Sequence, residues 1–186
     1  MISNKKELKE YIGSDNNWLI PNGIKGRLIS SYVSYPYTKI KRFLYYLRKQ
    51  EYYINNSSKS RINGFMSMFY ERKKNRLGSK LGIEIGPNCF GKGLNVYHIG
   101  SIIINPKVRA GEGCSLHGAN CIGNNGLTDS VPRLGNRVDV GYGAVIIGDV
   151  EIADDVKIGA NAVVNKSILE TGCTVVGVPA KVVIHK

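Results

Sequence analysis

The sequence predicts a mainly β protein, in which short strands stack into a solenoid over residues 82–186 after a basic, helical region over residues 1–81. Three observations lead to this prediction: a six-residue apolar repeat in the C-terminal part, helical apolar spacing before it, and a charge excess confined to the helical part. Of the 186 residues, 42% are hydrophobic, which provides for a sizeable core and excludes a disordered chain.

Two helices are predicted in residues 36–81. Apolar residues after Pro36 follow the i, i+3, i+4, i+7 spacing of one helical face: Ile40, Phe43, Leu44 and Leu47. A second set repeats this spacing: Ile62, Phe65, Met66 and Phe69. The polar residues 55–58 between the two sets suit a turn and an N-cap. Before Pro36 we expect only a short helix at residues 5–11.

The net charge of +12 is very uneven along the chain. Residues 36–81 contain 12 basic and 2 acidic residues, whereas residues 82–186 contain 9 of each. The change places a domain boundary near Gly82. A nucleic-acid-binding protein that uses the basic segment is one possible function, although no known nucleic-acid-binding motif is present.

The C-terminal part has an internal repeat with a period of six. Aliphatic residues recur at this interval: Leu134, Val140, Ile146, Ile152, Ile158 and Val164. Apolar residues also stand four positions after each of these: Val138, Ala144, Val150, Val156, Ala162 and Ile168. The same phase continues upstream through Ile104, Ala110, Leu116 and Ile122. Glycine often follows the first aliphatic residue.

A period of six fits short strands turned at fixed intervals around an axis, and it fits neither a helix nor simple alternation. Each strand would point its large aliphatic residue inward, and we expect the glycines to supply the backbone dihedrals of the corners. The segment Gly123–Arg133 is rich in turn residues. We expect this loop to project from the stacked strands.

The repeat part resembles the hexapeptide-repeat acyltransferases, most closely their serine acetyltransferase branch and its relatives from surface-polysaccharide loci. Five segments carry the resemblance: Gly93–His98, Leu116–Gly123, Val140–Ala144, Ile158–Val164 and Gly177–Lys181. The resemblance implies a left-handed parallel β-helix, a homotrimer, and acetyl-coenzyme A (acetyl-CoA) bound between adjacent prisms. It also implies an O-acetyltransferase, and in such a trimer we expect the loop Gly123–Arg133 to cap a neighbour's site.

His98 is the candidate catalytic base. Acetyl transfer to a hydroxyl needs a base that titrates near the operating pH, and histidine is the natural choice. The resemblance places His98 at the family's catalytic histidine and Glu84 near its acidic partner, which would fix the imidazole tautomer. If Glu84 is only a solvated residue at the prism edge, a backbone carbonyl must orient His98.

His117 is the second candidate histidine of the site. It follows His98 at an interval that exceeds one coil of about 18 residues by a single position, which would place the two histidines nearly one above the other. We expect both to face one cleft, where His117 orients the acceptor or shares the role of base. The alternative is that His117 is simply an exposed residue beside Leu116.

The resemblance assigns six residues to the coenzyme site: Gly123, Gly143, Ala144, Ala162, Lys166 and Lys181. Ala144 and Ala162 are small where neighbouring repeats have valine or isoleucine, and we expect them to leave a groove for the pantetheine arm. Lys166 and Lys181 would neutralise the nucleotide phosphates, although either could be a solvated lysine. No metal is expected.

Two departures from the serine acetyltransferase pattern bear on the acceptor. Tyr97 stands where that family usually has aspartate, and Val131 replaces a histidine before Pro132. These losses argue for an uncharged hydroxyl, on a sugar of a capsule or exopolysaccharide precursor, and Tyr97 would bind a sugar by packing on its ring. The alternative is a serine O-acetyltransferase of cysteine biosynthesis. A zinc hydratase would need a third histidine, and only His185 remains.

Location and surface contacts can also be predicted. The charged N-terminus does not look like a signal peptide, and no apolar run approaches the roughly 18 residues of a membrane span, so we expect a cytoplasmic protein. The four cysteines form no CxxC pair and are expected to be reduced thiols. The basic, aromatic helix Tyr37–Tyr53 suits peripheral contact with an anionic membrane surface, unless it is a solvated face over trimer contacts.

Overall fold

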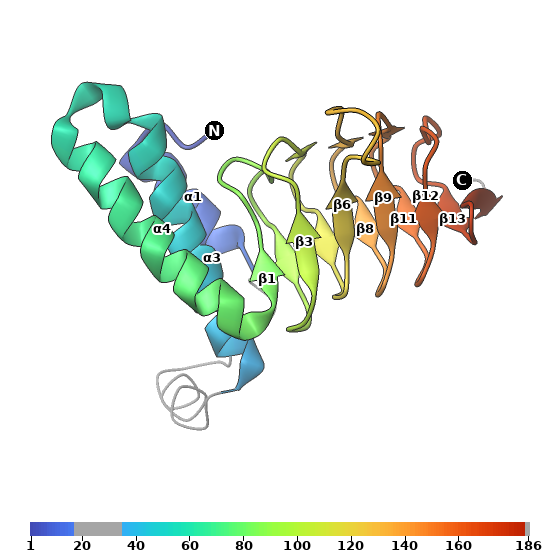
Figure 1. Cartoon of the computed structure of the whole chain (residues 1–186), viewed down its shortest axis with the longest axis horizontal. Coiled ribbons are helices and arrows are strands. Elements are labelled where there is room, and N and C mark those ends of the chain that lie inside the picture. The colour runs from blue at the N-terminus through green and yellow to red at the C-terminus, as the bar shows by residue number, and fades with distance from the viewer. Residues whose placement is uncertain (17–34, 185–186) are drawn as a thin grey trace.

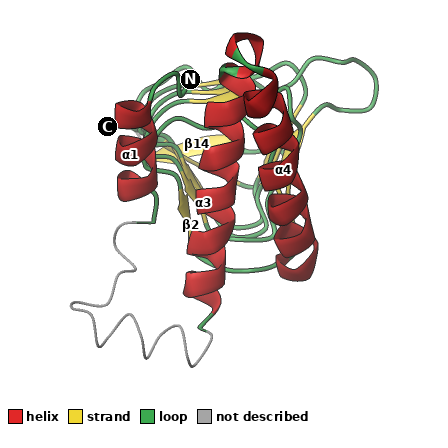
Figure 2. Cartoon of the chain, turned by 90° about the vertical axis from the view of Figure 1, so that its left-hand side faces the viewer, coloured by secondary structure: helices red, strands yellow, loops and turns green. Residues whose placement is uncertain are grey.

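The structure is a computed structural model that describes residues 1–16 and 35–184. Helices lie together at one end of a prism of short strands (Figure 1). Seen from that end, they cover the first coil of the prism (Figure 2). The helical elements are α1 (Lys5–Ser14), α3 (Pro36–Asn55), the 3₁₀ turn η2 (Ser57–Lys59) and α4 (Arg61–Leu81). Helices at all three predicted places are thus confirmed. None of the described helices is long and apolar enough to cross a membrane.

Local sequence signals set the helix ends. Pro36 begins α3, where its missing N–H would have no intrahelical partner. The N-cap of α4 is Ser60, whose hydroxyl accepts a hydrogen bond from the Ile62 N–H at 3.2 Å, so the cap lies just after the predicted turn. Gly82 ends α4 with a φ of 69°, and a Cβ there would lie only 2.7 Å from the carbonyl oxygen of Gly100.

The strands follow α4 and are two to four residues long. They are β1 (Ile83–Glu84), β2 (Asn95–Val96), β3 (Ile102–Ile104), β4 (Arg109–Ala110), β5 (Ser115–Leu116), β6 (Cys121–Gly123), β7 (Arg133–Leu134), β8 (Asp139–Val140), β9 (Val145–Ile147), β10 (Glu151–Ile152), β11 (Lys157–Ile158), β12 (Val163–Val164), β13 (Thr174–Val176) and β14 (Lys181–Ile184). The sheet orders are β1-β3-β6-β9-β12, β10-β7-β4 and β14-β13-β11-β8-β5-β2. Pairing is parallel except between β13 and β14, as expected for a chain that coils around an axis.

The coils differ in length. Val145 of β9 pairs with Val163 of β12, which makes a regular coil of three hexads, whereas Cys121 of β6 pairs with Val145, which makes a coil one hexad longer. The extra residues form the loop between β6 and β7, whose residues 124–129 are exposed. The prediction that this loop leaves the regular coil is confirmed. The coil from Asn95 to its partner Ser115 is also longer than three hexads, by two positions, which matters for the site below.

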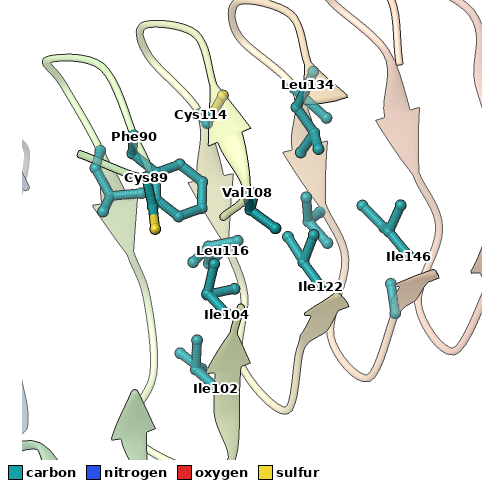
Figure 3. Close-up of a cluster of buried hydrophobic side chains, with 14 of the residues drawn as sticks. Cys89, Phe90, Ile102, Ile104, Val108, Cys114, Leu116, Ile122, Leu134 and Ile146 are labelled. Carbon is teal, nitrogen blue, oxygen red and sulfur yellow. The ribbon is translucent and has the colours of Figure 1, made fainter. Parts of the chain in front are cut away.

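The prism core consists of the repeat aliphatics. Leu116, Ile122 and Ile146 are fully buried and point into the interior (Figure 3). The thiols of Cys89 and Cys114 share this core, and burial raises the pKa of each to about 11. The six-residue repeat therefore describes the inside of the prism, as predicted.

The repeat position after the inward aliphatic is glycine for a different reason from the one predicted. Gly141 does not have a positive φ; instead, a Cβ there would lie 2.6 Å from the carbonyl oxygen of Ile158 in the next coil. The left-handed backbone occurs two residues further on, at Gly143 (φ 73°) and equally at Asn161 (φ 57°) in the next coil. Close approach of neighbouring coils, not corner geometry, excludes larger residues at the repeat glycine.

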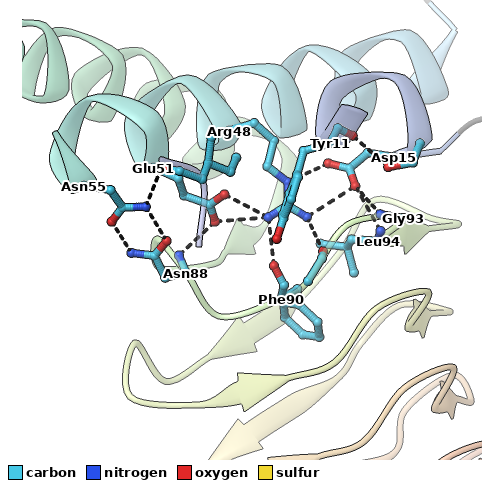
Figure 4. Close-up of polar contacts among 12 residues, drawn as sticks. Tyr11, Asp15, Arg48, Glu51, Asn55, Asn88, Phe90, Gly93 and Leu94 are labelled. Atoms are coloured by element: carbon cyan, nitrogen blue, oxygen red, sulfur yellow. Dashed lines mark hydrogen bonds and ion pairs between the residues drawn. The ribbon is translucent and has the colours of Figure 1, made fainter. Parts of the chain in front are cut away.

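A buried ion-pair network joins the helices to the prism (Figure 4). Arg48 of α3 donates to the carboxylates of Asp15 (2.7 Å) and Glu51 (2.9 Å) and to the carbonyl oxygens of Phe90 (2.9 Å) and Gly91 (2.7 Å). Burial by itself would lower the pKa of Arg48, but the two carboxylates outweigh it and raise the pKa. Arg48 thus stays charged inside the protein and ties three chain segments together.

The helices and the prism also share one hydrophobic core. Phe43, Leu44 and Leu47 of α3 belong to the same buried cluster as the prism aliphatics. The helices end at Leu81 and the strands begin at Ile83. The division into a basic helical region, residues 1–81, and a β-helix domain, residues 82–186, stays a prediction.

Candidate functional site

The candidate site lies at the corner that follows β2. Tyr97 and His98 come directly after Val96, and the N–H of Tyr97 donates to the carbonyl oxygen of Leu116 at 2.9 Å. Among the described strands β2 lies at the edge of its sheet, and the side chain of Asn16 covers the backbone of Val96 on the open side. Asn16 accepts from the Val96 N–H at 2.7 Å and donates to the Val96 carbonyl at 3.1 Å. The corner is therefore held from both sides.

The two histidines are not stacked as predicted. Because the coil between β2 and β5 is two positions longer than a regular one, Tyr97 lies over His117, with ring centroids 4.4 Å apart and planes 15° from parallel. His98 is one position further along the corner. The prediction was wrong in register by one residue, but it placed both histidines on the same corner of adjacent coils.

His98 lies beside Gly118 and is exposed. A Cβ on Gly118 would lie 3.4 Å from the Cβ of His98 and 3.2 Å from a ring carbon of Tyr142, so the glycine leaves the space between these side chains open. His98 makes no hydrogen bond or ion pair with any residue in the described part of the chain. The exposed imidazole of His98 is therefore the group of this corner that we consider for contact with an acceptor.

His117 does have a carboxylate partner. Its Nε2 lies 2.8 Å from Oδ1 of Asp139, which belongs to β8 in the next coil. A carboxylate only accepts hydrogen bonds, so a neutral His117 must donate from Nε2 and keep the lone pair on Nδ1. Asp139 on the edge and Tyr97 on the face together fix the ring.

Within the described part of the chain no hydrogen bond or ion pair joins Glu84 to His98. Instead Glu84 of β1 lines a cleft of about 610 Å³ between α4 and the first coil, together with Lys74 and Ser101. Lys74 is buried there, donates to the Ile85 carbonyl oxygen at 2.9 Å, and has its pKa lowered by burial. The pairing of Glu84 with His98 stays a prediction that this geometry does not support.

Comparison with known proteins identifies proteins that are similar in sequence to this chain. No family model matches the chain. A serine acetyltransferase of Helicobacter pylori is 42% identical over 105 residues, which are 55% of this chain and 61% of that protein. A serine acetyltransferase of Synechococcus elongatus is 33% identical over 105 residues, 43% of its length. Over 105 residues this chain is thus similar to serine acetyltransferases. The chain spans less than two thirds of the length of these relatives.

Solved structures support the fold of this serine acetyltransferase-like β-helix. The serine acetyltransferase from Brucella abortus aligns with a TM-score of 0.72 over 97% of this chain and 69% of its own, at 21% identity. A serine acetyltransferase in complex with CoA aligns with a TM-score of 0.72 over 96% of this chain and 71% of its own, at 22% identity. The predicted fold class, a left-handed parallel β-helix preceded by helices, is confirmed.

The expected coenzyme residues are only partly accessible on this serine acetyltransferase-like prism. Ala144 and Ala162 are fully buried, so their side chains fill the inside of a corner and cannot form an external groove. The position four after each aliphatic points inward, and the place of both alanines at the coenzyme site stays a prediction. Lys166 and Lys181 are exposed, and Gly123 ends β6 at a buried position.

Sequence reasoning missed three residues of the site. Asp139 occupies the repeat position before an inward aliphatic, where acidic residues look like ordinary surface. Asn120 is buried, accepts from the Gly118 N–H at 3.0 Å and donates to the Gly141 carbonyl at 2.8 Å, bracing the corner. Asn16 lies 80 residues from its partner in the chain. Across the described residues no three metal-ligating side chains gather, and His185 lies outside them.

Proposed function

We propose that the protein is an acetyl-CoA-dependent O-acetyltransferase and that its acceptor is serine. The observation that carries the proposal is the exposed His98 beside the carboxylate-held His117, on a β-helix that is 42% identical to a serine acetyltransferase. The named relatives favour serine over the sugar hydroxyl predicted from the sequence.

In the proposed reaction His98 is the general base. The acceptor hydroxyl gives its proton to the imidazole of His98 while its oxygen attacks the thioester carbonyl carbon. The carbon–sulfur bond then breaks, and the imidazolium returns the proton to the leaving CoA thiolate. His117, with Nε2 held by Asp139, would position the acceptor through Nδ1.

Acetyl-CoA would supply the acetyl group. A relative of known structure is described in complex with CoA, which supports the same donor here. Lys166 and Lys181 are exposed near the C-terminal end of the prism, where their ammonium groups suit phosphate binding. Gly143, which is partly exposed, would let the pantetheine arm approach the backbone closely, whereas the buried Gly123 would shape the wall behind it.

A sugar hydroxyl is the second candidate acceptor. Tyr97, in place of the usual aspartate, has its ring stacked on His117, so the corner offers an aromatic surface and lacks a carboxylate at that position. Such a surface suits a sugar ring better than the ammonium group of serine.

The assembly proposed with this function is a homotrimer in the cytoplasm. Ile99 and Ile103 are exposed on the corner and strand that follow His98, and a neighbouring prism would cover such apolar side chains. The size of the purified protein in solution, measured by light scattering, tests the trimer.

The activity is tested by CoA release from acetyl-CoA, with serine and a panel of sugars as separate acceptors. We expect serine to drive release and His98→Ala to lower kcat by about 10²- to 10⁴-fold. Asp139→Asn should raise the KM for the acceptor and leave the KM for acetyl-CoA unchanged, whereas Asp149→Asn, an exposed carboxylate elsewhere on the prism, should change neither. Release driven only by a sugar would shift the acceptor, and no release in any mixture would overturn the proposal.

A further inference from the structure

The first half of α4 presents an apolar surface to solvent. Ile62, Phe65, Met68 and Phe69 have exposed fractions of 72, 66, 62 and 41%. Their spacing places them on one side of the helix, and α4 packs inward through Ser67, Lys74, Gly78 and Leu81 instead. The apolar face predicted from Ile62, Phe65 and Phe69 therefore exists, but it faces away from the core. We call these four exposed side chains the α4 apolar face.

The surroundings of the α4 apolar face are strongly basic. Eight of the 12 basic residues in the described segment 36–81 are exposed, among them Arg61, Arg72 and Lys73 on α4 itself. Of its two acidic residues, Glu51 is buried against Arg48, which leaves Glu71 exposed. The exposed cations therefore greatly outnumber the exposed carboxylates.

A groove continues this basic surface along the helix pair. It has a volume of about 220 Å³ between α3 and α4, and its lining includes Arg42, Lys73, Arg76 and Lys80. Tyr46 forms part of its wall. Such a groove offers several ammonium and guanidinium groups to one phosphate. It lies further along α4, beyond the α4 apolar face. Figure 1 shows that the first turns of α4 lie at the end of the helix far from β1 and the strands.

We propose that the α4 apolar face docks on an anionic lipid bilayer. Ile62, Phe65, Met68 and Phe69 would enter the boundary between headgroups and acyl chains, and the flanking cations would contact lipid phosphates. This combination of exposed apolar side chains and unopposed positive charge is what a bilayer with acidic headgroups complements. The inference does not rest on the proposed enzyme activity.

The distribution of charge favours an anionic bilayer over two other partners, a second copy of the chain and a nucleic acid. A second copy of the chain placed symmetrically on this face would bring the cations Arg61, Arg72 and Lys73 against the same cations of the partner, which is repulsive. A nucleic acid would satisfy the cations, but Ile62 and Met68 offer no aromatic face for base stacking and would stay exposed. A bilayer with acidic headgroups complements both the apolar and the charged groups.

The test is co-sedimentation of the full chain with vesicles of phosphatidylcholine alone and of equal parts phosphatidylcholine and phosphatidylglycerol. We expect binding to the anionic vesicles only. The double variants Phe65→Ser with Met68→Ser and Arg72→Glu with Lys73→Glu should each lower the bound fraction at least about tenfold. Leu127→Ser, which removes an 88% exposed leucine from the prism loop, is the matched control and should bind like the wild type.

The remaining outcomes overturn the proposal. These are equal binding to neutral vesicles, no binding to either kind, or unchanged binding of both double variants. Two further results would assign the face to another occupant: a smaller assembly of Phe65→Ser with Met68→Ser without lipid, or tighter binding of an oligonucleotide than of anionic vesicles. Circular dichroism of each variant is the control for folding. We expect the spectra to match that of the wild type, because the substituted residues are on the surface.

Discussion

Replacing Arg48 by methionine should lower the free energy of unfolding far more than replacing an arginine on the surface. The Arg48 side chain is 0% exposed and donates to two buried carboxylates and two carbonyl oxygens. Methionine fills much of the same volume but leaves Asp15 and Glu51 buried without a cation. Breaking a buried pair in this way costs about 3–5 kcal/mol, because the desolvated charges lose their compensation.

The measurement is urea unfolding followed by circular dichroism, at one protein concentration for all variants. Arg137→Met is the matched control, because Arg137 makes the same two-pronged contact with Asp155 (2.6 and 2.8 Å) but on the surface, with its side chain 59% exposed. We expect that loss to be much smaller, since water screens exposed pairs. Equal losses for the two arginine variants would refute the argument that burial makes the Arg48 network important.

A triple variant separates charge from shape. Arg48→Met combined with Asp15→Asn and Glu51→Gln removes the cation and both carboxylates together, so no uncompensated charge stays buried. This variant should be more stable than Arg48→Met alone, since replacing a whole buried ion pair costs less than breaking it. A triple variant that is less stable than the single one would show that packing, and not charge, controls the network.

Other predictions concern the prism. Cys121 should react with a thiol reagent in the native protein, whereas Cys89 and Cys114, buried and with pKa values raised to about 11, should react only after unfolding. Ile146→Ala should lower the free energy of unfolding by about 2–5 kcal/mol, because this isoleucine is fully buried. Gly118→Ala should lower the free energy of unfolding by about 1–3 kcal/mol and lower activity, since Gly118 has a φ of 118° and a tyrosine ring of the next coil faces it. Unchanged urea midpoints would contradict the predictions for Ile146→Ala and Gly118→Ala.

The fold could be predicted because its signal is periodic and local. Each coil repeats the same inward aliphatic, so Leu134 and Val140 report the same geometry as every later repeat. The site depended on coil length instead. In a regular coil His117 would lie over Ile99, and the two extra positions between Asn95 and Ser115 place it over Tyr97 instead. A period of six does not reveal where such residues are inserted.

The orientation of α4 was not predictable from apolar spacing. Gly78 packs against the chain so closely that a Cβ there would clash with the carbonyl oxygen of Ile83 and lie 3.0 Å from the ring of Phe43. Small residues such as Gly78 and Ser67 form the inward face because they allow this approach. A hydrophobic period counts large side chains and therefore selected the opposite face, the one that includes Phe65.

The helical region contributes directly to the geometry of the candidate site. Arg48 fixes Asp15, whose Oδ1 accepts from the N–H groups of Gly93 and Leu94, both at 3.0 Å. The next residue, Asn16, covers the edge of β2 at Val96, and Tyr97 and His98 follow at once in the chain. A continuous series of contacts thus runs from the buried guanidinium to the exposed imidazole. Among the described strands β2 has no neighbour on that side, so we expect the loss of Arg48 to loosen the corner at His98 as well as to lower the stability.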